Sequence, residues 1–137
     1  MSTQPHPYAG PVSHKALAPD AEARRRGRVM MFNATRPDGM DGWTMDLRQY
    51  ELMRDHILDM VTNGADADGT ILLKEVVFAA QKRYATHELF PNGRVRNYCT
   101  FTKVDLEARR EVERVPGSSP QRLRLPLDGE PVARTIS

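Results

Sequence analysis

The sequence predicts an α+β domain that is mainly α, arranged as a winged helix-turn-helix with three helices followed by a β-hairpin wing. Three observations lead to this prediction. Apolar residues recur at helical spacing in three stretches between residues 47 and 109. Two short strand-like runs come after them, and residues 116–120 (Pro-Gly-Ser-Ser-Pro) supply the turn that joins these runs. In that order, the third helix keeps one solvent face that can enter a groove.

One domain accounts for the chain, since 137 residues is a typical domain length. We expect this winged-helix domain to span residues 29–125, where the periodic patterns lie. Residues 1–28 are rich in proline and end in a basic run, which predicts a disordered basic tail. Residues 126–137 predict a flexible C-terminal tail. The single cysteine, Cys99, excludes an intrachain disulfide and a multi-cysteine zinc site, so a reducing cytoplasm is the expected location.

The three helices are predicted from their apolar stripes. The first covers residues 47–62, where Asp46 can cap the helix and Gln49 completes a capping-box-like pair. The second covers residues 72–85, and the third covers residues 95–109 with a less regular stripe. Together these stretches supply most of the expected core.

Extended structure is expected on either side of the helices. Residues 111–125 predict the hairpin. Residues 29–32 (Val-Met-Met-Phe) form an apolar cluster that we expect to dock on the domain as a short extended segment. Residues 33–42 carry the chemistry of turns, and Trp43 is expected to anchor this loop to the core.

Charge is distributed unevenly along the chain, although the net charge is only +2. Residues 29–93 carry −4, whereas residues 1–28 carry +3 and residues 94–124 carry +4. An acidic middle between two basic segments indicates an acidic partner for those segments, such as nucleic acid. The alternative is an ordinary solvated surface. No run approaches the ~18 apolar residues of a membrane span, so we expect no membrane partner.

The nucleic-acid pattern lies at the start of the third helix and on the hairpin. In a winged helix, early residues of the third helix reach base edges and cations of the wing reach phosphates. Arg96 and Asn97 are suited to bidentate reading of guanine and adenine. Against this pattern, Glu107, Glu111 and Glu113 would be repelled by phosphates. The candidate DNA-binding residues are Arg94, Arg96, Asn97, Thr100, Lys103, Arg122 and Arg124.

Five blocks of sequence carry a resemblance to a known family. They are KVDLEAR at 103–109, ERVP at 113–116, PQRLR at 120–124, LFPNG at 89–93 and YELMR at 50–54. In this combination the chain resembles the DUF6958-type family of small bacterial proteins of unknown function, over about residues 30–125. The resemblance implies a winged-helix-like domain and no known activity, so no catalytic residue is carried over.

Two positions depart from the family pattern. Arg110 stands where the family has a glycine; if the position needs a positive φ, a residue other than glycine costs roughly 1 kcal/mol there. Asn97 and Tyr98 stand where the family usually has a tryptophan early in the third helix. This change makes the start of that helix more hydrophilic.

These observations favour a DNA-binding protein of the transcriptional-regulator type. It would read double-stranded DNA with the helix over 95–109 and contact phosphates with the hairpin over 111–125. The alternative is a protein–protein interaction module with the same fold and no nucleic-acid binding.

We expect no enzyme activity, no cofactor and no metal site. No metalloprotease, nucleophile-elbow or phosphate-loop motif occurs, and Cys99 has no base near it in the sequence. The four histidines have no ligand spacing, and His56 is expected to be structural.

One loop partly matches the calcium loop of an EF-hand. With Gly69 at the invariant glycine position, Asp66 and Asp68 fall at ligand positions three and five and Glu75 at position twelve, but Gly64 occupies position one. Because Gly64 supplies no carboxylate, calcium should not bind with micromolar affinity. Calorimetric titration with calcium checks this prediction, and micromolar binding would favour an EF-hand instead.

Overall fold

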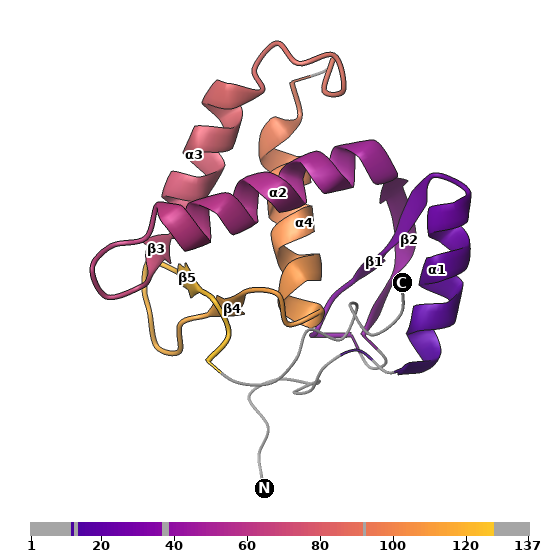
Figure 1. Cartoon of the computed structure of the whole chain (residues 1–137), viewed down its shortest axis with the longest axis horizontal. Helices are drawn as coiled ribbons and strands as arrows, with labels where there is room; N and C mark the ends of the chain where they lie inside the picture. Colours follow the sequence, from indigo (N-terminus) through magenta and orange to yellow (C-terminus); the bar gives the residue numbers. More distant parts are fainter. Residues whose placement is uncertain (1–11, 13, 37–38, 92, 128–137) are drawn as a thin grey trace, which may run out of the picture.

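The structure is a computed structural model that describes residue 12 and residues 14–36, 39–91 and 93–127. Over these residues it contains a 3₁₀ turn, four α-helices and five short strands (Figure 1). The predicted α+β class is confirmed. In chain order the elements are η1 (His14–Ala16), α1 (Leu17–Arg25), β1 (Arg28–Phe32), β2 (Met40–Asp46), α2 (Leu47–Asn63), β3 (Ile71–Leu72), α3 (Leu73–Arg83), α4 (Val95–Ala108), β4 (Glu113–Arg114) and β5 (Arg122–Arg124).

The three predicted helices and the hairpin are confirmed as α2, α3, α4 and the antiparallel pair β4–β5. Asp46 caps α2, since its carboxylate accepts hydrogen bonds from the backbone N–H groups of Arg48 and Gln49. The Gln49 side chain does not close a capping box. Its amide donates instead to the carbonyl of Leu89 (2.7 Å), which ties the start of α2 to the loop before α4.

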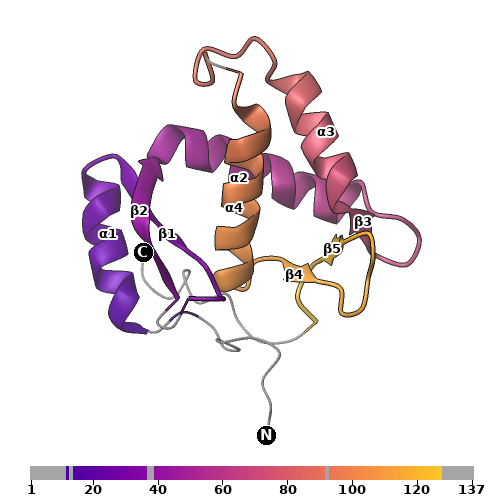
Figure 2. The same cartoon turned by 180° about the vertical axis from the view of Figure 1, so that it is seen from behind.

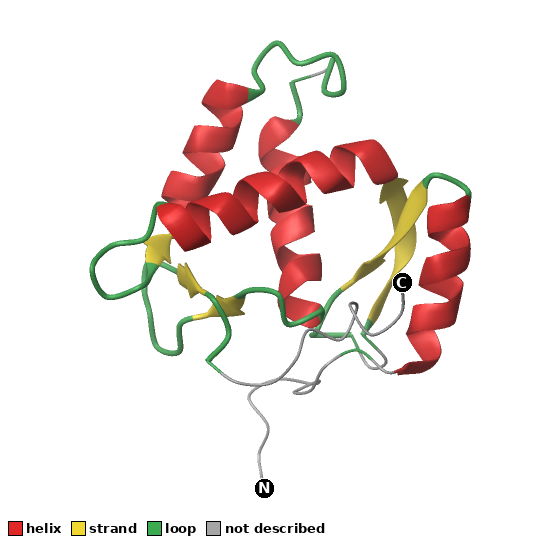
Figure 3. Ribbon diagram, viewed as in Figure 1, coloured by secondary structure: helices red, strands yellow, loops and turns green. Residues whose placement is uncertain are grey.

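The hairpin belongs to a three-stranded antiparallel sheet with the strand order β3–β5–β4 (Figure 3). In β3, Ile71 lies opposite Leu123 of β5, and both side chains are buried. The backbone N–H of Leu73 extends this connection by donating to the carbonyl of Gln121 (3.0 Å). The sheet therefore joins the loop before α3 to the hairpin that follows α4.

The N-terminal part differs from the sequence prediction, because residues 17–25 form helix α1 where a disordered tail was expected. This helix buries Leu17 and Ala23. Pro19 is compatible with it because it lies in the first turn, where backbone N–H groups have no partner within the helix. Alanines take the place of large apolar residues and leave no strong helical period. The outer parts of the two predicted tails, residues 1–11 and 128–137, lie outside the described residues.

Residues 29–32 are extended, as expected, and pair with a strand that the sequence did not predict. Strand β2 runs antiparallel to β1, with Val29 opposite Met45 and an irregularity between Met30 and Phe32. Trp43 lies on β2 rather than in a loop, and it packs against the core. The turn residues around β2 concealed it in the sequence.

The β1–β2 hairpin lies between α1 on one face and α2 with α4 on the other (Figures 1 and 2). Val29 and Met45 belong to the main core, whereas Phe32 packs in a smaller cluster with Leu17 and Ala108. In Figure 2, α4 crosses α2, and no described helix or strand passes in front of α4. Arg96, Asn97 and Phe101 lie on one face of α4 and are exposed, so this face is open to solvent.

Helix α4 ends at a residue in the left-handed conformation. Arg110 has φ = 63°, and among the described residues other than glycine it alone has a positive φ. Its N–H donates to the carbonyl of Glu107 (3.1 Å), and the N–H of Glu111 donates to the carbonyl of Leu106 (2.9 Å). These two bonds define a Schellman motif, in which glycine is the favoured residue at the left-handed position.

Replacing Arg110 with glycine should stabilise the fold by about 0.5–1 kcal/mol, because glycine adopts a positive φ without a clash of Cβ. Replacing it with valine should destabilise the fold by about 1–2 kcal/mol, because a branched side chain is disfavoured at this φ. Urea denaturation followed by circular dichroism measures both changes. A loss of stability in R110G would show that the arginine side chain contributes more than its backbone conformation costs.

Candidate nucleic-acid interface

The C-terminal half of α4 carries a buried charge network. Asp105 and Arg109 lie one turn apart and are completely buried, with Arg109 Nε 2.7 Å from Asp105 Oδ1. The same oxygen accepts a hydrogen bond from the hydroxyl of Tyr50 on α2 (2.6 Å). The guanidinium carbon of Arg109 lies 4.3 Å from the ring centroid of Phe32 on β1. Two charges of the Asp-Leu-Glu-Ala-Arg block thus join α4 to α2 and β1.

The network also provides hydrogen-bond partners for the backbone groups on the edge of β1 that faces away from β2. The N–H of Phe32 donates to Asp105 Oδ2 (2.9 Å), and the N–H of Met30 donates to Asp20 Oδ1 of α1 (3.0 Å). The carbonyl of Met30 accepts from Arg109 Nη2 (2.8 Å). Arg109 Nη1 also donates to Asp20 Oδ2 (2.9 Å), which closes the network. Side chains here satisfy backbone groups that a neighbouring strand would otherwise pair.

Burial and charge shift the pKa values of these groups in different directions. Burial raises the pKa of Asp105, although the guanidinium of Arg109 opposes the rise. Burial also raises the pKa of Tyr50 well above its usual range, so that its hydroxyl stays a donor. For Asp20, burial alone would raise the pKa, but the hydrogen bond and charge of Arg109 hold it below its ordinary value. Asp20 is therefore the firmly ionised partner of Arg109.

Removing Asp105 should destabilise the protein strongly. In D105A, the buried Arg109 loses one of its two carboxylates, and the N–H of Phe32 loses its acceptor, so we expect a loss of about 3–5 kcal/mol in unfolding free energy. Asp55 provides a matched control, since it is exposed and D55A should change stability by less than about 0.5 kcal/mol. Urea denaturation measures both variants. A cost below about 1 kcal/mol for D105A would contradict the importance of the network.

Arg94, Arg96 and Asn97 lie at the exposed N-terminal end of α4, as predicted. In the part of the chain that the structure describes, neither Arg94 nor Arg96 forms an ion pair. The hydroxyl of Thr100 donates to the carbonyl of Arg96 (2.9 Å), which leaves its oxygen as an acceptor. Four of the seven predicted residues thus lie along the first half of α4, at or near solvent.

Lys103 has a different environment from the one the sequence suggests. Its side chain is buried, and Nζ donates to Glu107 Oε1 (3.0 Å) and to Gln121 Oε1 (2.8 Å). Gln121 lies directly before strand β5 of the hairpin, so the ammonium group of Lys103 connects α4 to the hairpin. It does not extend the exposed basic face.

The two predicted cations of the hairpin are held by carboxylates. Arg122 Nη1 lies 2.9 Å from Asp66 Oδ2, in the loop between α2 and α3. Arg124 forms an ion pair with Glu113 on the neighbouring strand. The seven predicted residues therefore do not form one continuous positive face, because the positive charge of β5 is offset by these partners.

Two exposed side chains escaped the sequence reasoning, and they lie on different elements. Arg114 on β4 is exposed, and it has no ion pair within the described residues. Phe101 is 44% exposed on α4, and its ring meets Trp43 edge-on with 5.2 Å between the centroids. A helical wheel could have placed Phe101 beside Asn97, but its contact with Trp43 depends on the unpredicted strand β2.

The acidic loop is organised by hydrogen bonds and by the ion pair with Arg122. Asp68 Oδ1 accepts from the N–H and the hydroxyl of Thr70 (3.0 and 2.9 Å), and Asp66 is the partner of Arg122. Calcium would have to displace this arginine, which gives the weak-binding prediction a second physical reason. Among the described residues, no group of three His, Cys, Asp or Glu side chains could hold a metal ion.

Cys99 and His56 are parts of the core. Cys99 is buried, and burial raises the pKa of its thiol to about 12, so it stays protonated and unreactive. His56 is also buried, with Nε2 2.9 Å from the carbonyl of Val76, and its predicted structural role is confirmed.

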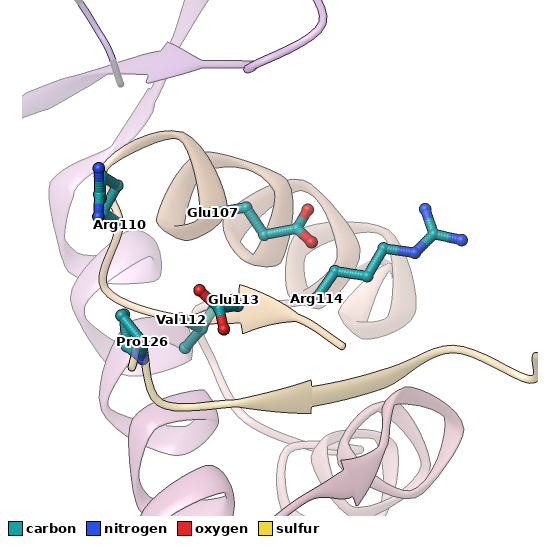
Figure 4. Close-up of a pocket in the computed structure, with 6 residues that line it drawn as sticks. All are labelled: Glu107, Arg110, Val112, Glu113, Arg114 and Pro126. Carbon is teal, nitrogen blue, oxygen red and sulfur yellow. The ribbon is translucent and has the colours of Figure 1, made fainter. Parts of the chain in front are cut away.

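A small cleft of about 210 Å³ lies between the end of α4 and the hairpin (Figure 4). This volume is below the range of about 300–1,000 Å³ that is typical of ligand pockets. In Figure 4 the side chain of Arg114 extends away from the cleft. Acidic and basic side chains both line the cleft, and we assign it no ligand. The lining residues are Glu107, Arg110, Val112, Glu113, Arg114 and Pro126.

Residues 28–123 match the DUF6958 family, a family of unknown function. The match covers well over half of the chain, and the protein belongs to this family. The matched region contains the elements from β1 through β4 and most of β5, whereas α1 lies before it. No curated protein and no solved structure matches the chain. None of the helices within the described ranges has the length and apolar character needed to cross a membrane.

Proposed function

We propose that this DUF6958 protein is a winged helix-turn-helix protein of the transcriptional-regulator type, which binds double-stranded DNA with the first half of α4. The observation that carries the proposal is the pair Arg94 and Arg96, both exposed and without ion pairs in the described part of the chain. Asn97 beside them offers an amide that can pair with the major-groove edge of adenine.

The order of the elements supports this proposal. From α2 onward, the chain follows the sequence helix, strand, helix, helix and two-stranded hairpin, with β5 between β3 and β4. In a winged helix-turn-helix with this order, α4 is the recognition helix, and its N-terminal residues approach the base edges. The exposed face of α4, which carries Arg96 and Asn97, is the side that would enter the groove.

The hairpin contributes less positive charge to this interface than the sequence suggests. The charges of Arg122 and Arg124 are offset by Asp66 and Glu113. Among the cations of the hairpin, Arg114 is the one that is exposed without an ion pair in the described residues. On mixed-sequence DNA the expected footprint is therefore small, with the three positive charges of Arg94, Arg96 and Arg114 close to phosphates.

The second candidate function is a protein–protein interaction module with the same fold. The ion pairs of Arg122 and Arg124 favour it, because a hairpin with offset charge has little attraction for phosphates. The two candidates differ in one measurable property, which is salt-dependent affinity for DNA.

The affinity for mixed-sequence duplex DNA should fall with salt, with a log–log slope of about 2–3 for three phosphate contacts. The double variant R94A/R96A should lower this slope by about two units. Arg96→Ala alone should cost about 1–3 kcal/mol on a preferred site and relax the choice of base there. Fluorescence anisotropy between about 50 and 200 mM salt measures all three quantities.

Two control variants test whether the effect belongs to α4. Arg122→Ala and Arg124→Ala remove cations that are already paired, so the slope should change by less than about half a unit in each. Absence of binding by the wild type at about 50 mM salt would contradict the DNA proposal and leave the protein-interaction module. Equal losses in the α4 and β5 variants would show that the hairpin shares the contact with α4.

A further inference from the structure

The open face of α4 also carries an aromatic side chain, Phe101, that has no role in the proposed DNA contacts. Phe101 lies four residues after Asn97, so the two side chains occupy the same face one turn apart. The separation along the helix axis is about 6 Å, at about 1.5 Å per residue. With a spacing of about 3.4 Å between base pairs, this distance corresponds to nearly two steps.

The ring of Phe101 is partly exposed and packs against one neighbouring aromatic ring. Trp43 of β2 contacts it edge-on, at 5.2 Å between centroids. Trp43 is itself held by a hydrogen bond from Nε1 to Asp41 Oδ2 (2.8 Å), and Asp41 pairs with Arg36 (3.0 Å). A large apolar side chain that is exposed on one side and supported by a neighbouring ring on the other is suited to contact with another apolar group.

One apolar group is available in the major groove of DNA. Thymine presents its C5-methyl there, and no other base of standard DNA carries a methyl group at its major-groove edge. We propose that Phe101 is a specificity-determining residue that packs against a thymine methyl, about two base pairs from the base that Asn97 contacts. This inference rests on the proposed function, because it requires α4 to lie in the major groove.

Uracil provides a direct test, since it pairs like thymine but lacks the methyl group. A preferred duplex is first selected from a random pool with the wild-type chain. Each thymine of that duplex is then replaced in turn by deoxyuridine, and affinity is measured by fluorescence anisotropy. At one thymine, the replacement should weaken wild-type binding about fourfold, which corresponds to about 0.8 kcal/mol for one buried carbon.

Variants of Phe101 should remove this sensitivity. F101A should bind the thymine and uracil duplexes equally, and F101Q should do the same while keeping a side chain suited to a helix. Phe78→Ala is the matched control, because Phe78 is 62% exposed on α3 and outside this face, so the fourfold ratio should persist.

Two results would overturn the inference separately from the proposed function. They are a selected site in which no thymine is sensitive to uracil, and an F101Q variant that keeps the sensitivity of the wild type. In both cases salt-dependent binding through Arg94 and Arg96 would still stand. If the wild type shows no salt-dependent binding at all, the proposed function and this inference are both wrong.

Discussion

The guanidinium of Arg109 is the point at which three layers of the molecule meet. It donates to Asp105 on its own helix, to Asp20 on α1 and to the carbonyl of Met30 on β1. Withdrawing these charges from water costs several kcal/mol per ion, and the cost is offset only where hydrogen bonds are nearly complete. Such bonds are directional, so they fix how α4 sits against β1 in a way that apolar contacts alone do not.

This arrangement divides α4 into two halves with different roles. The second half is committed to the interior through Asp105 and Arg109, and Lys103 connects it to the hairpin. The first half keeps Arg96 and Asn97 in solvent. A helix that is anchored at one end can present the other end rigidly, which lowers the entropy lost when a partner binds.

The sequence predicted the helices and the hairpin that carry a recognisable pattern in their own residues. α2, α3 and α4 each bury one stripe of side chains, and the hairpin is marked by its turn, so local patterns were sufficient. β3 is a two-residue strand that exists because Leu123, far away in the chain, lies opposite Ile71. Helix α1 has alanines at positions where larger apolar residues would give a clear helical pattern of hydrophobicity. Its stability depends on contacts with β1.

The candidate site shows the same limit. The sequence shows an amphipathic helix over this region. Its pattern is sufficient to predict that the side chains at its start are exposed, namely Arg94, Arg96 and Asn97. The ion pair between Arg122 and Asp66 joins residues that are 56 positions apart, and no local pattern predicts it. A count of cations along the chain therefore overestimates the positive charge that a partner meets on the hairpin.

The position of α1 relative to the family has a consequence for self-association. The region that matches DUF6958 begins at residue 28, after α1 ends, yet α1 supplies the carboxylate that satisfies the N–H of Met30. A chain lacking this helix would have an unsatisfied N–H on β1 and would leave Arg109 with a single carboxylate. Open strand edges pair with other chains and lead to aggregation. In this protein, α1 covers the part of the β1 edge that would otherwise be open to pairing with another strand.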